Sequence, residues 1–214
     1  MDLDALKDYT LKYWTEAKDT HVADPAYYRL AETELRKILE RHLRPGGNVL
    51  DVGCGNGEYT VMLAERAGRL LAFDVSESLL AAARKRCEAL GNVFFFQANV
   101  AVGKLAFSGH VDAVFCMGVF ACLPDDAQLT KLLDDFADYL VDDGLLVLRD
   151  STVRGPQQYV QYPSGHLGYY RNKAALLETL DQKGFDLAEE IALKAEREPF
   201  NDYFVLRKRA SSGV

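Results

Sequence analysis

Short apolar runs alternate with longer amphipathic segments through most of the chain. Continuous hydrophobic runs are typical of strands buried on both faces of a sheet; they occupy residues 48–52, 69–75, 92–100, 111–120 and 145–151. The segments between them carry apolar residues at helical spacing; they occupy residues 57–68, 76–91 and 124–144. This alternation predicts a parallel sheet covered by helices on both faces.

The two ends of the chain extend this pattern. Residues 1–44 are predicted to be helical, with one helix that begins near Pro25 and an earlier, shorter helix that carries Tyr9, Tyr13 and Trp14. A helix over 172–185 precedes two last strands at 187–193 and 203–209. The tyrosine-rich stretch 149–172 contains glycines and prolines, which disfavour a regular element there.

Capping signals refine the helix boundaries. Ser76 is expected to be the N-cap of one helix, and Gly68, Gly91 and Gly144 are expected to follow helix ends. No linker or repeat interrupts the pattern. The chain is therefore predicted to be one domain over 1–214, with a helical extension or lid (1–44), a core (45–150) and a C-terminal segment (151–214).

Composition and charge narrow the class of protein. The chain is 49 % hydrophobic and 27 % charged, which suits a single globular domain with a core. Its net charge of −7, with no basic face in the pattern, makes a nucleic-acid partner unexpected. No apolar run could span a bilayer, and the acidic start is unlike a secretory signal. We expect a cytoplasmic protein that is a monomer or homodimer and has no membrane partner.

The segment VLDVGCGNGEYT places three glycines, Gly53, Gly55 and Gly57, directly after the first predicted strand. In open α/β sheets, ligands bind at the carboxyl ends of the strands, so this turn predicts a nucleotide-sized ligand. The dinucleotide fingerprint needs a third glycine where this chain has Glu58. A carboxylate there would repel a pyrophosphate, which disfavours NAD.

These motifs together resemble the class I S-adenosylmethionine-dependent methyltransferases, over most of residues 45–150. The family has a Rossmann-like, doubly wound, seven-stranded sheet whose last strand is antiparallel. The resemblance implies S-adenosylmethionine as cofactor and S-adenosylhomocysteine as product. It implies ribose binding by Asp74, a contact of Asn99 with the adenine amino group, and a methionine end near Asp51. The cofactor-binding set that follows is Asp51, Gly53, Cys54, Gly55, Gly57, Asp74, Val75, Asn99, Val100, Met117 and Gly118.

The methyl acceptor is predicted to bind the segment that follows the fifth strand, as is common in this family. Aromatic rings there could exclude water or hold a cationic amine, and an arginine could bind a carboxylate or phosphate. His166 is the candidate general base, because its ordinary pKa lies nearest neutral pH; a surface-loop histidine is the alternative. The candidate acceptor residues are Tyr13, Trp14, Arg154, Tyr159, Tyr162, Tyr169, Tyr170 and Arg171.

The predicted activity is metal-independent methyl transfer to a nitrogen or oxygen of a small molecule. No metal is expected, because the fourth predicted strand ends in Cys116, Met117 and Gly118 without an acid, and Asp150 ends the fifth strand alone. Two other readings stay open. The first is a cofactor-binding pseudoenzyme that acts as a regulator or partner subunit, and the weaker second is an oxidoreductase.

Overall fold

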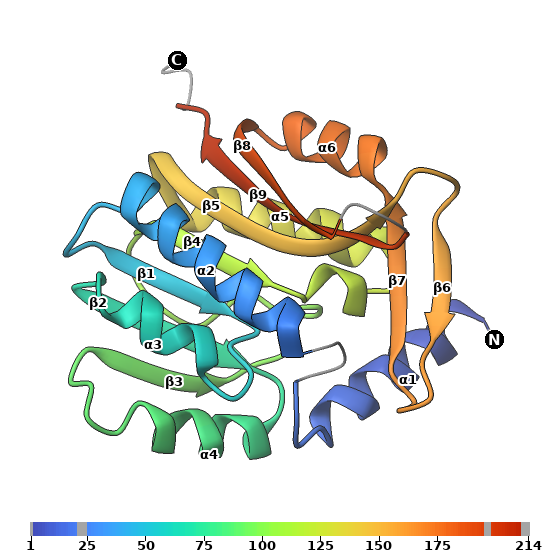
Figure 1. The fold of residues 1–214 in the computed structure, drawn as a ribbon, viewed down its shortest axis with the longest axis horizontal. Coiled ribbons are helices and arrows are strands. Elements are labelled where there is room, and N and C mark those ends of the chain that lie inside the picture. Colours follow the sequence, from blue (N-terminus) through green and yellow to red (C-terminus); the bar gives the residue numbers. More distant parts are fainter. Residues whose placement is uncertain (1, 21–24, 195–197, 211–214) are drawn as a thin grey trace.

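The computed structural model describes residues 2–20, 25–194 and 198–210, which build one mixed sheet flanked by helices (Figure 1). The main path of the sheet runs β3–β2–β1–β4–β5, and these strands pair in parallel. Their bounds are β1 Asn48–Val52, β2 Arg69–Asp74, β3 Val93–Gln97, β4 Val111–Met117 and β5 Leu140–Val153. The sheet continues through β9 (Phe200–Lys208), which is antiparallel to β5, and β8 (Phe185–Lys194), which is antiparallel to β9.

The predicted α/β fold with an antiparallel last strand is confirmed, but the described residues form nine strands rather than seven. The two additional strands are β6 (Gln158–Gln161) and β7 (Leu167–Asn172). They pair as a hairpin, and β7 also joins the end of β5. This region was predicted to be irregular. Its glycines and prolines instead lie mostly in the turns that flank the two strands, where these residues favour chain reversal.

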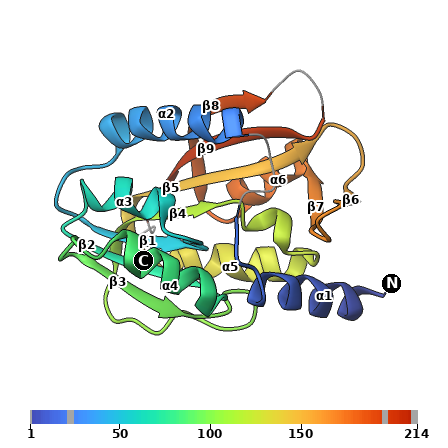
Figure 2. The same cartoon turned by 60° about the horizontal axis from the view of Figure 1, so that its bottom comes forward.

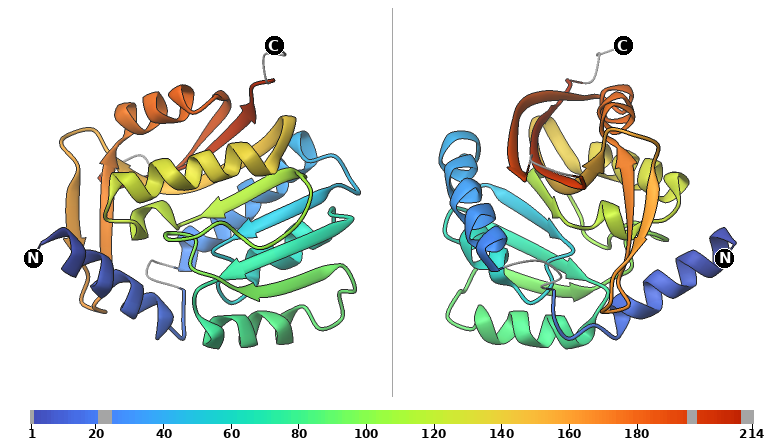
Figure 3. Two further views of the ribbon diagram at one scale, coloured as in Figure 1. Left: turned by 180° about the vertical axis from the view of Figure 1, so that it is seen from behind. Right: turned by 45° about the vertical axis from the view of Figure 1, so that its right-hand side comes forward.

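Helices cover both faces of the sheet (Figures 1 and 3). α2 (Pro25–His42) and α3 (Glu58–Ala64) share one hydrophobic cluster with alternate residues of the central strands, and α4 (Glu77–Arg86) packs against α3. α5 (Asp126–Tyr139) and α6 (Lys173–Gln182) share the cluster on the opposite face. This two-sided burial explains why the strands are continuous apolar runs.

α3, α4 and α5 all end before the glycine that was expected to follow them, and for α3 and α5 a tertiary contact ends the helix. α5 ends at Tyr139, not at Gly144, because Leu140 already pairs with Val111 of β4 and Asp143 adopts a left-handed φ of 59°. α3 ends at Ala64, not at Gly68. The Gly68 amide instead donates to the carbonyl of Gly47, 2.8 Å away, which turns the chain into β2. In both places a tertiary contact overrides the helical propensity of the segment.

The carboxyl ends of the parallel strands point toward α1 (Leu3–Thr15) and the β6–β7 hairpin (Figures 1 and 2). α1 lies beside this hairpin, and Tyr9 Oη donates a hydrogen bond of 2.7 Å to the carbonyl of Gly165 (Figure 3). A short 3₁₀ helix, η1 (Phe120–Cys122), follows β4 at the same edge. No helix in the described ranges is long and apolar enough to cross a membrane.

Candidate active site

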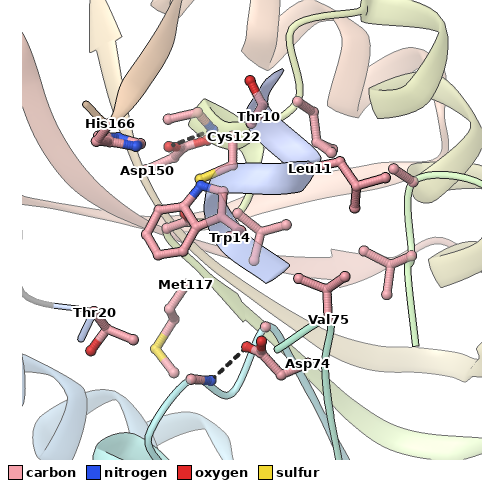
Figure 4. A pocket seen from close by; sticks show the side chains of 18 of the residues that line it. Thr10, Leu11, Trp14, Thr20, Asp74, Val75, Met117, Cys122, Asp150 and His166 are labelled. Carbon is pink, nitrogen blue, oxygen red and sulfur yellow. Dashed lines mark hydrogen bonds between the residues drawn. The ribbon is translucent and has the colours of Figure 1, made fainter. Parts of the chain in front are cut away.

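A cavity of about 790 Å³ lies at the carboxyl ends of β1, β2, β4 and β5, beneath α1 (Figure 4). Pockets that bind small molecules typically measure about 300–1,000 Å³, so it can hold a nucleotide-sized ligand and a second small molecule. The wall has two parts. We call the cofactor half the part formed by Gly53, Cys54, Gly55, Asp74, Val75, Asn99, Val100, Met117, Gly118 and Arg149. We call the acceptor half the part formed by Thr10, Leu11, Trp14, Cys122, Gln128, Asp150, Tyr162, His166 and Tyr170.

The turn after β1 is a backbone cradle. Gly53 and Gly55 have φ of 74° and 55°, in the left-handed region that favours glycine. The amides of Gly53 and Cys54 both donate to the carbonyl of Phe73, at 2.8 and 3.0 Å, which fixes the turn against β2. A Cβ on Gly53 would lie 2.3 Å from Val119 Cγ2, and one on Gly55 would lie 2.6 Å from Thr20 Cγ2. Both glycines are therefore required by close packing against Val119 and Thr20, and both also line the cavity.

Gly57 and Asp51, also predicted to bind the cofactor, do not line the cavity. Gly57 is the N-cap of α3, and a Cβ there would lie 2.9 Å from both Cα and Cβ of Ala83, so its role is close packing of α3 on α4. Asp51 is 2 % exposed and accepts a hydrogen bond of 2.7 Å from Thr60 Oγ1. Burial raises its pKa to about 7.

Asp74 ends β2 on the cavity wall and organises the turn around it. Its Oδ2 accepts a hydrogen bond of 2.8 Å from the Gly55 amide, and its Oδ1 accepts one of 2.9 Å from the Ser76 amide (Figure 4). Burial raises the pKa of Asp74, and these amides oppose that shift. Each carboxylate oxygen keeps a free lone pair, so both can still accept ligand hydroxyl groups.

The remaining wall of the cofactor half lies beside Asp74. Val75 and Val100 present apolar surface, and Asn99 Oδ1 accepts a hydrogen bond of 3.0 Å from the Ala101 amide. The Asn99 carbonyl is thus partly committed to its own turn, although its second lone pair is available. Met117 and Gly118 form the wall at the end of β4 (Figure 4).

Arg149 brings a buried cation to this half, which sequence reasoning missed. Its guanidinium donates to Tyr59 Oη and lies 4.8 Å from the centre of the Tyr59 ring and 5.8 Å from that of Tyr27. A Cβ on Gly118 would lie 3.6 Å from its Nη2. Arg149 therefore places positive charge beside the end of β4, where a ligand carboxylate could bind.

His166 lies in the acceptor half among aromatic rings. It is 4 % exposed, its ring centre lies 5.3 Å from Trp14 and 5.5 Å from Tyr162, and its Nδ1 has no hydrogen-bond partner among the described residues. Burial lowers its pKa to about 4, so the imidazole is neutral near pH 7. The alternative of a surface-loop histidine does not fit this burial.

Asp150 is the second residue that sequence reasoning missed, having been considered only as a metal ligand. It is 4 % exposed and lies beside Cys122 and His166 on the wall (Figure 4). Its Oδ1 accepts hydrogen bonds from the amides of Ala121, 3.2 Å away, and Ser151, 2.8 Å away. Burial raises its pKa to about 7. Its place at the end of a predicted strand was the signal that could have found it.

Three buried polar atoms of the acceptor half lack a hydrogen-bond partner among the described residues: Thr10 Oγ1, Gln128 Oε1 and His166 Nδ1. The indole N–H of Trp14 donates to the thiol of Cys122. The three atoms are fully buried, so they do not face the open part of the cavity.

Five of the predicted acceptor residues lie outside the cavity wall: Tyr13, Arg154, Tyr159, Tyr169 and Arg171. Arg171 is committed elsewhere, because it donates to Asp126 Oδ1 and to the carbonyls of Phe120 and Leu123, all within 2.8 Å. Tyr159 and Tyr169 stack on each other with ring centres 4.6 Å apart.

Arg154 and Tyr13 also lie outside the cavity wall. Arg154 is exposed and lies 4.8 Å from the centre of the Phe200 ring. Tyr13 packs behind Trp14 and His166. Across the described ranges, no three His, Cys, Asp or Glu side chains gather where they could hold a metal ion.

Part of the chain is similar to proteins of known family. Residues 49–144 match the family model described as a methyltransferase domain. Over these residues the chain is similar to the methyltransferases. An O-methyltransferase of ubiquinone biosynthesis from Azotobacter vinelandii is 32 % identical over 124 residues, which are 57 % of this chain and 52 % of that relative.

Solved structures share the fold of this chain at low sequence identity. DhpI in complex with S-adenosylhomocysteine is 22 % identical, with a TM-score of 0.70 and coverage of 98 % of both chains. The N-methyltransferase NodS from Bradyrhizobium japonicum, with S-adenosylhomocysteine, is 18 % identical, with a TM-score of 0.71 and coverage of 96 % and 97 %. The chain spans between 33 % and 53 % of the length of the first curated relatives it matches.

Proposed function

We propose that this protein transfers a methyl group from S-adenosylmethionine to a nitrogen or oxygen of a small-molecule acceptor, without a metal ion. The observation that carries this proposal is the continuity of the cavity, which joins the Asp74 and Gly55 end to the Trp14 and Asp150 end. The relatives and structural neighbours include both O- and N-methyltransferases, so either acceptor atom is compatible with the family.

The residues of the cofactor half fit S-adenosylmethionine. The Gly53–Gly55 turn lines the cavity, Asp74 can accept both ribose hydroxyls, and Arg149 can bind the carboxylate of the methionine end. When bound, this cofactor supplies an electrophilic methyl group on a sulfonium. No role is assigned to Asp51, because Thr60 holds it away from the wall.

The protein's contribution to the reaction is to align the two molecules and exclude water. α1 and the β6–β7 hairpin close the cavity over the strand ends and supply the aromatic wall. The side chains at the end of β4 support a metal-independent reaction. β4 ends in Cys116 and Met117, and burial raises the pKa of the Cys116 thiol, which keeps it protonated. His166 remains the candidate general base of the sequence prediction, as a neutral imidazole.

Titration calorimetry with S-adenosylmethionine, S-adenosylhomocysteine and NADH tests the cofactor. We expect micromolar dissociation constants for the two sulfur compounds and no binding of NADH. Methyl transfer to a panel of amines, phenols and carboxylates is then followed by mass spectrometry. Binding of NADH alone would contradict the proposal, and cofactor binding with no turnover on any acceptor would favour the pseudoenzyme.

A further inference from the structure

The acceptor half contains a buried carboxylate without a direct cationic partner. Both hydrogen bonds to Asp150 reach Oδ1, and within the described part of the chain none reaches Oδ2. Asp150 stands on the cavity wall, so Oδ2 is the oxygen left for a ligand. A buried charge is costly unless it is paired, so the site favours an occupant that supplies a positive charge or a proton.

The neighbouring cations are held by other groups. Arg149, the residue before Asp150 on β5, points to the opposite face of the sheet, where Tyr59 and Tyr27 hold its guanidinium. Arg171 donates to Asp126 and to two carbonyls. Lys7, at the mouth of the cavity, forms ion pairs with Asp4 and Asp125. A carboxylate or phosphate acceptor would therefore find no free cation in this half among the described residues.

The rest of the wall suits an ammonium group. Trp14, Tyr162 and His166 form an aromatic surface next to Asp150, and aromatic faces attract cations. The ligand should thus carry a positive charge on a nitrogen that can lie against these rings and reach Asp150.

We propose that the methyl acceptor is a small primary or secondary amine, and that Asp150 Oδ2 removes its proton. This inference rests on the proposed methyl transfer and names its substrate class and base. An ammonium has no lone pair, so it must lose a proton before it can attack. His166 then lines the aromatic wall and need not act as the base.

In this step an N–H bond and a carbon–sulfur bond break, and an O–H bond and a nitrogen–carbon bond form. Asp150 takes one proton from the ammonium, and the freed nitrogen lone pair forms a bond to the methyl carbon. The carbon–sulfur bond breaks with its electron pair going to sulfur, which gives S-adenosylhomocysteine and an N-methylammonium product. Asp150 returns its proton to water after the product leaves. Burial raises the pKa of this carboxyl to about 7, which suits proton exchange near neutral pH.

The first test measures charge preference without knowing the natural acceptor. Trp14 is the single tryptophan of the chain, so its fluorescence reports binding in the S-adenosylhomocysteine complex. We expect ethylammonium chloride to bind at least tenfold more tightly than sodium acetate, and the Asp150→Asn variant to lose this preference. The amide oxygen can still accept from Ala121 and Ser151, so that variant keeps the local fold. Asp135→Asn, a buried acid on α5 paired with Lys131, is the matched control and should keep the preference.

The possible outcomes separate failure of the amine proposal from failure of the proposed function. Acetate binding as tightly as ethylammonium, or a preference that survives in Asp150→Asn, would overturn the amine proposal while leaving methyl transfer intact. Failure of the wild-type protein to bind S-adenosylhomocysteine would instead refute the proposed function, and the amine proposal would fall with it.

The pH dependence of turnover separates a catalytic base from a structural carboxyl. With ethanolamine as acceptor, we expect a wild-type rate that levels off above pH 7, and a loss of at least 100-fold in Asp150→Asn at pH 7. An alkyl amine has a pKa of about 10, so the rate of the variant should recover toward that pH. A loss that is equal at every pH would mean a structural role.

Other groups that titrate or carry charge face Asp150 and could contribute to the profile. They are Cys116 on β4, Cys122 on η1, Tyr162 and His166 at the hairpin, and Tyr170 and Arg171 on β7, whereas the guanidinium of Arg149 lies on the opposite face of the sheet. Burial raises the pKa of Cys116, Cys122 and Tyr170 above their ordinary values, and the pKa of His166 lies near 4. These shifts move the titration of all four groups away from pH 7. Phenol methylation with no amine methylation would overturn the amine proposal.

Discussion

The two halves of the cavity are built in different ways. The cofactor half is made by the turns that directly follow β1, β2 and β4, and much of its surface is main chain around Gly53, Gly55 and Gly118. The acceptor half is made by side chains from α1, η1, β5 and the hairpin, which are far apart in sequence. The difference shows that a backbone-built site leaves a contiguous motif, whereas a site assembled by topology leaves scattered residues.

The largest expected effect comes from Arg171, which was predicted to bind the acceptor but anchors η1 to β7. Replacing it with leucine leaves the carbonyl of Leu123 without its side-chain donor and removes one of the two donors to the carbonyl of Phe120. We expect Arg171→Leu to lower the free energy of unfolding by about 3 kcal/mol, measured by urea denaturation. The exposed Arg154→Leu is the control, with an effect of about 0.5 kcal/mol or less. Full stability combined with lost acceptor binding would return Arg171 to the acceptor site.

Asp74 tests whether the cofactor half depends on one carboxylate. Asp74→Ala removes the acceptor of the Gly55 and Ser76 amides and of any ligand hydroxyl. The expected loss in S-adenosylhomocysteine binding is about 2 kcal/mol, or roughly 30-fold in the dissociation constant by calorimetry. Asp74→Asn keeps one acceptor oxygen and should lie between wild type and alanine. An unchanged dissociation constant in both variants would remove Asp74 from the ribose role.

His166 should make the stability of the protein depend on pH, because burial in the acceptor half holds its imidazole neutral. Its pKa is lowered to about 4 in the folded protein, so below pH 6.5 the unfolded chain binds the proton that the folded chain does not. Wild-type stability should fall as pH drops from 6.5 to 4 because of this group.

The variant His166→Asn should lack this loss. The stability of the variant relative to wild type should be about 2 kcal/mol greater at pH 5 than at pH 8. Urea denaturation at the two pH values measures the difference. The same relative stability at both values would show that the imidazole titrates normally and is not buried as described.

The smallest expected effect concerns the closure of the acceptor half by α1. Tyr9→Phe removes the hydrogen bond to the Gly165 carbonyl and should weaken docking of α1 by about 1 kcal/mol. Amide hydrogen exchange in α1 should accelerate about fivefold, while exchange in β1 and β4 is unchanged. Tyr13→Phe alters a neighbouring hydroxyl and is the control. Equal protection of α1 in both variants would mean that aromatic packing alone holds the helix.

The sequence predicted the strand–helix order and the wall of the cofactor half apart from Arg149, since the predicted residues lie at or after the ends of apolar runs. It also placed Trp14, Tyr162, Tyr170 and His166 near the acceptor, where they line the cavity. The sequence did not tell which side chains of the hairpin face the acceptor. Residues 149–172 were predicted to be irregular, so the alternation of side chains along a strand was not used there.

The alternation of side chains along the two strands of the hairpin decides which of its residues face the cavity. Side chains in a strand alternate between faces, so Tyr170 points into the cavity while Tyr169 and Arg171 share the other face; the Arg171 guanidinium lies 4.6 Å from the centre of the Tyr169 ring. Tyr159 pairs with Tyr169 and belongs to that outer face too. Arg149 and Asp150 diverge on β5 for the same reason.

The hydrogen bond between Tyr9 and Gly165 joins residues 156 positions apart. Chains grow from the amino end on the ribosome, and contacts of large sequence separation form late in folding. Once residues through β5 have emerged, the nascent chain can already arrange the turns that follow β1, β2 and β4. The first helix made has to wait for one of the last hairpins before it finds its place. A stalled or truncated chain ending before β7 would therefore present an uncovered cofactor surface and no chamber for a second molecule.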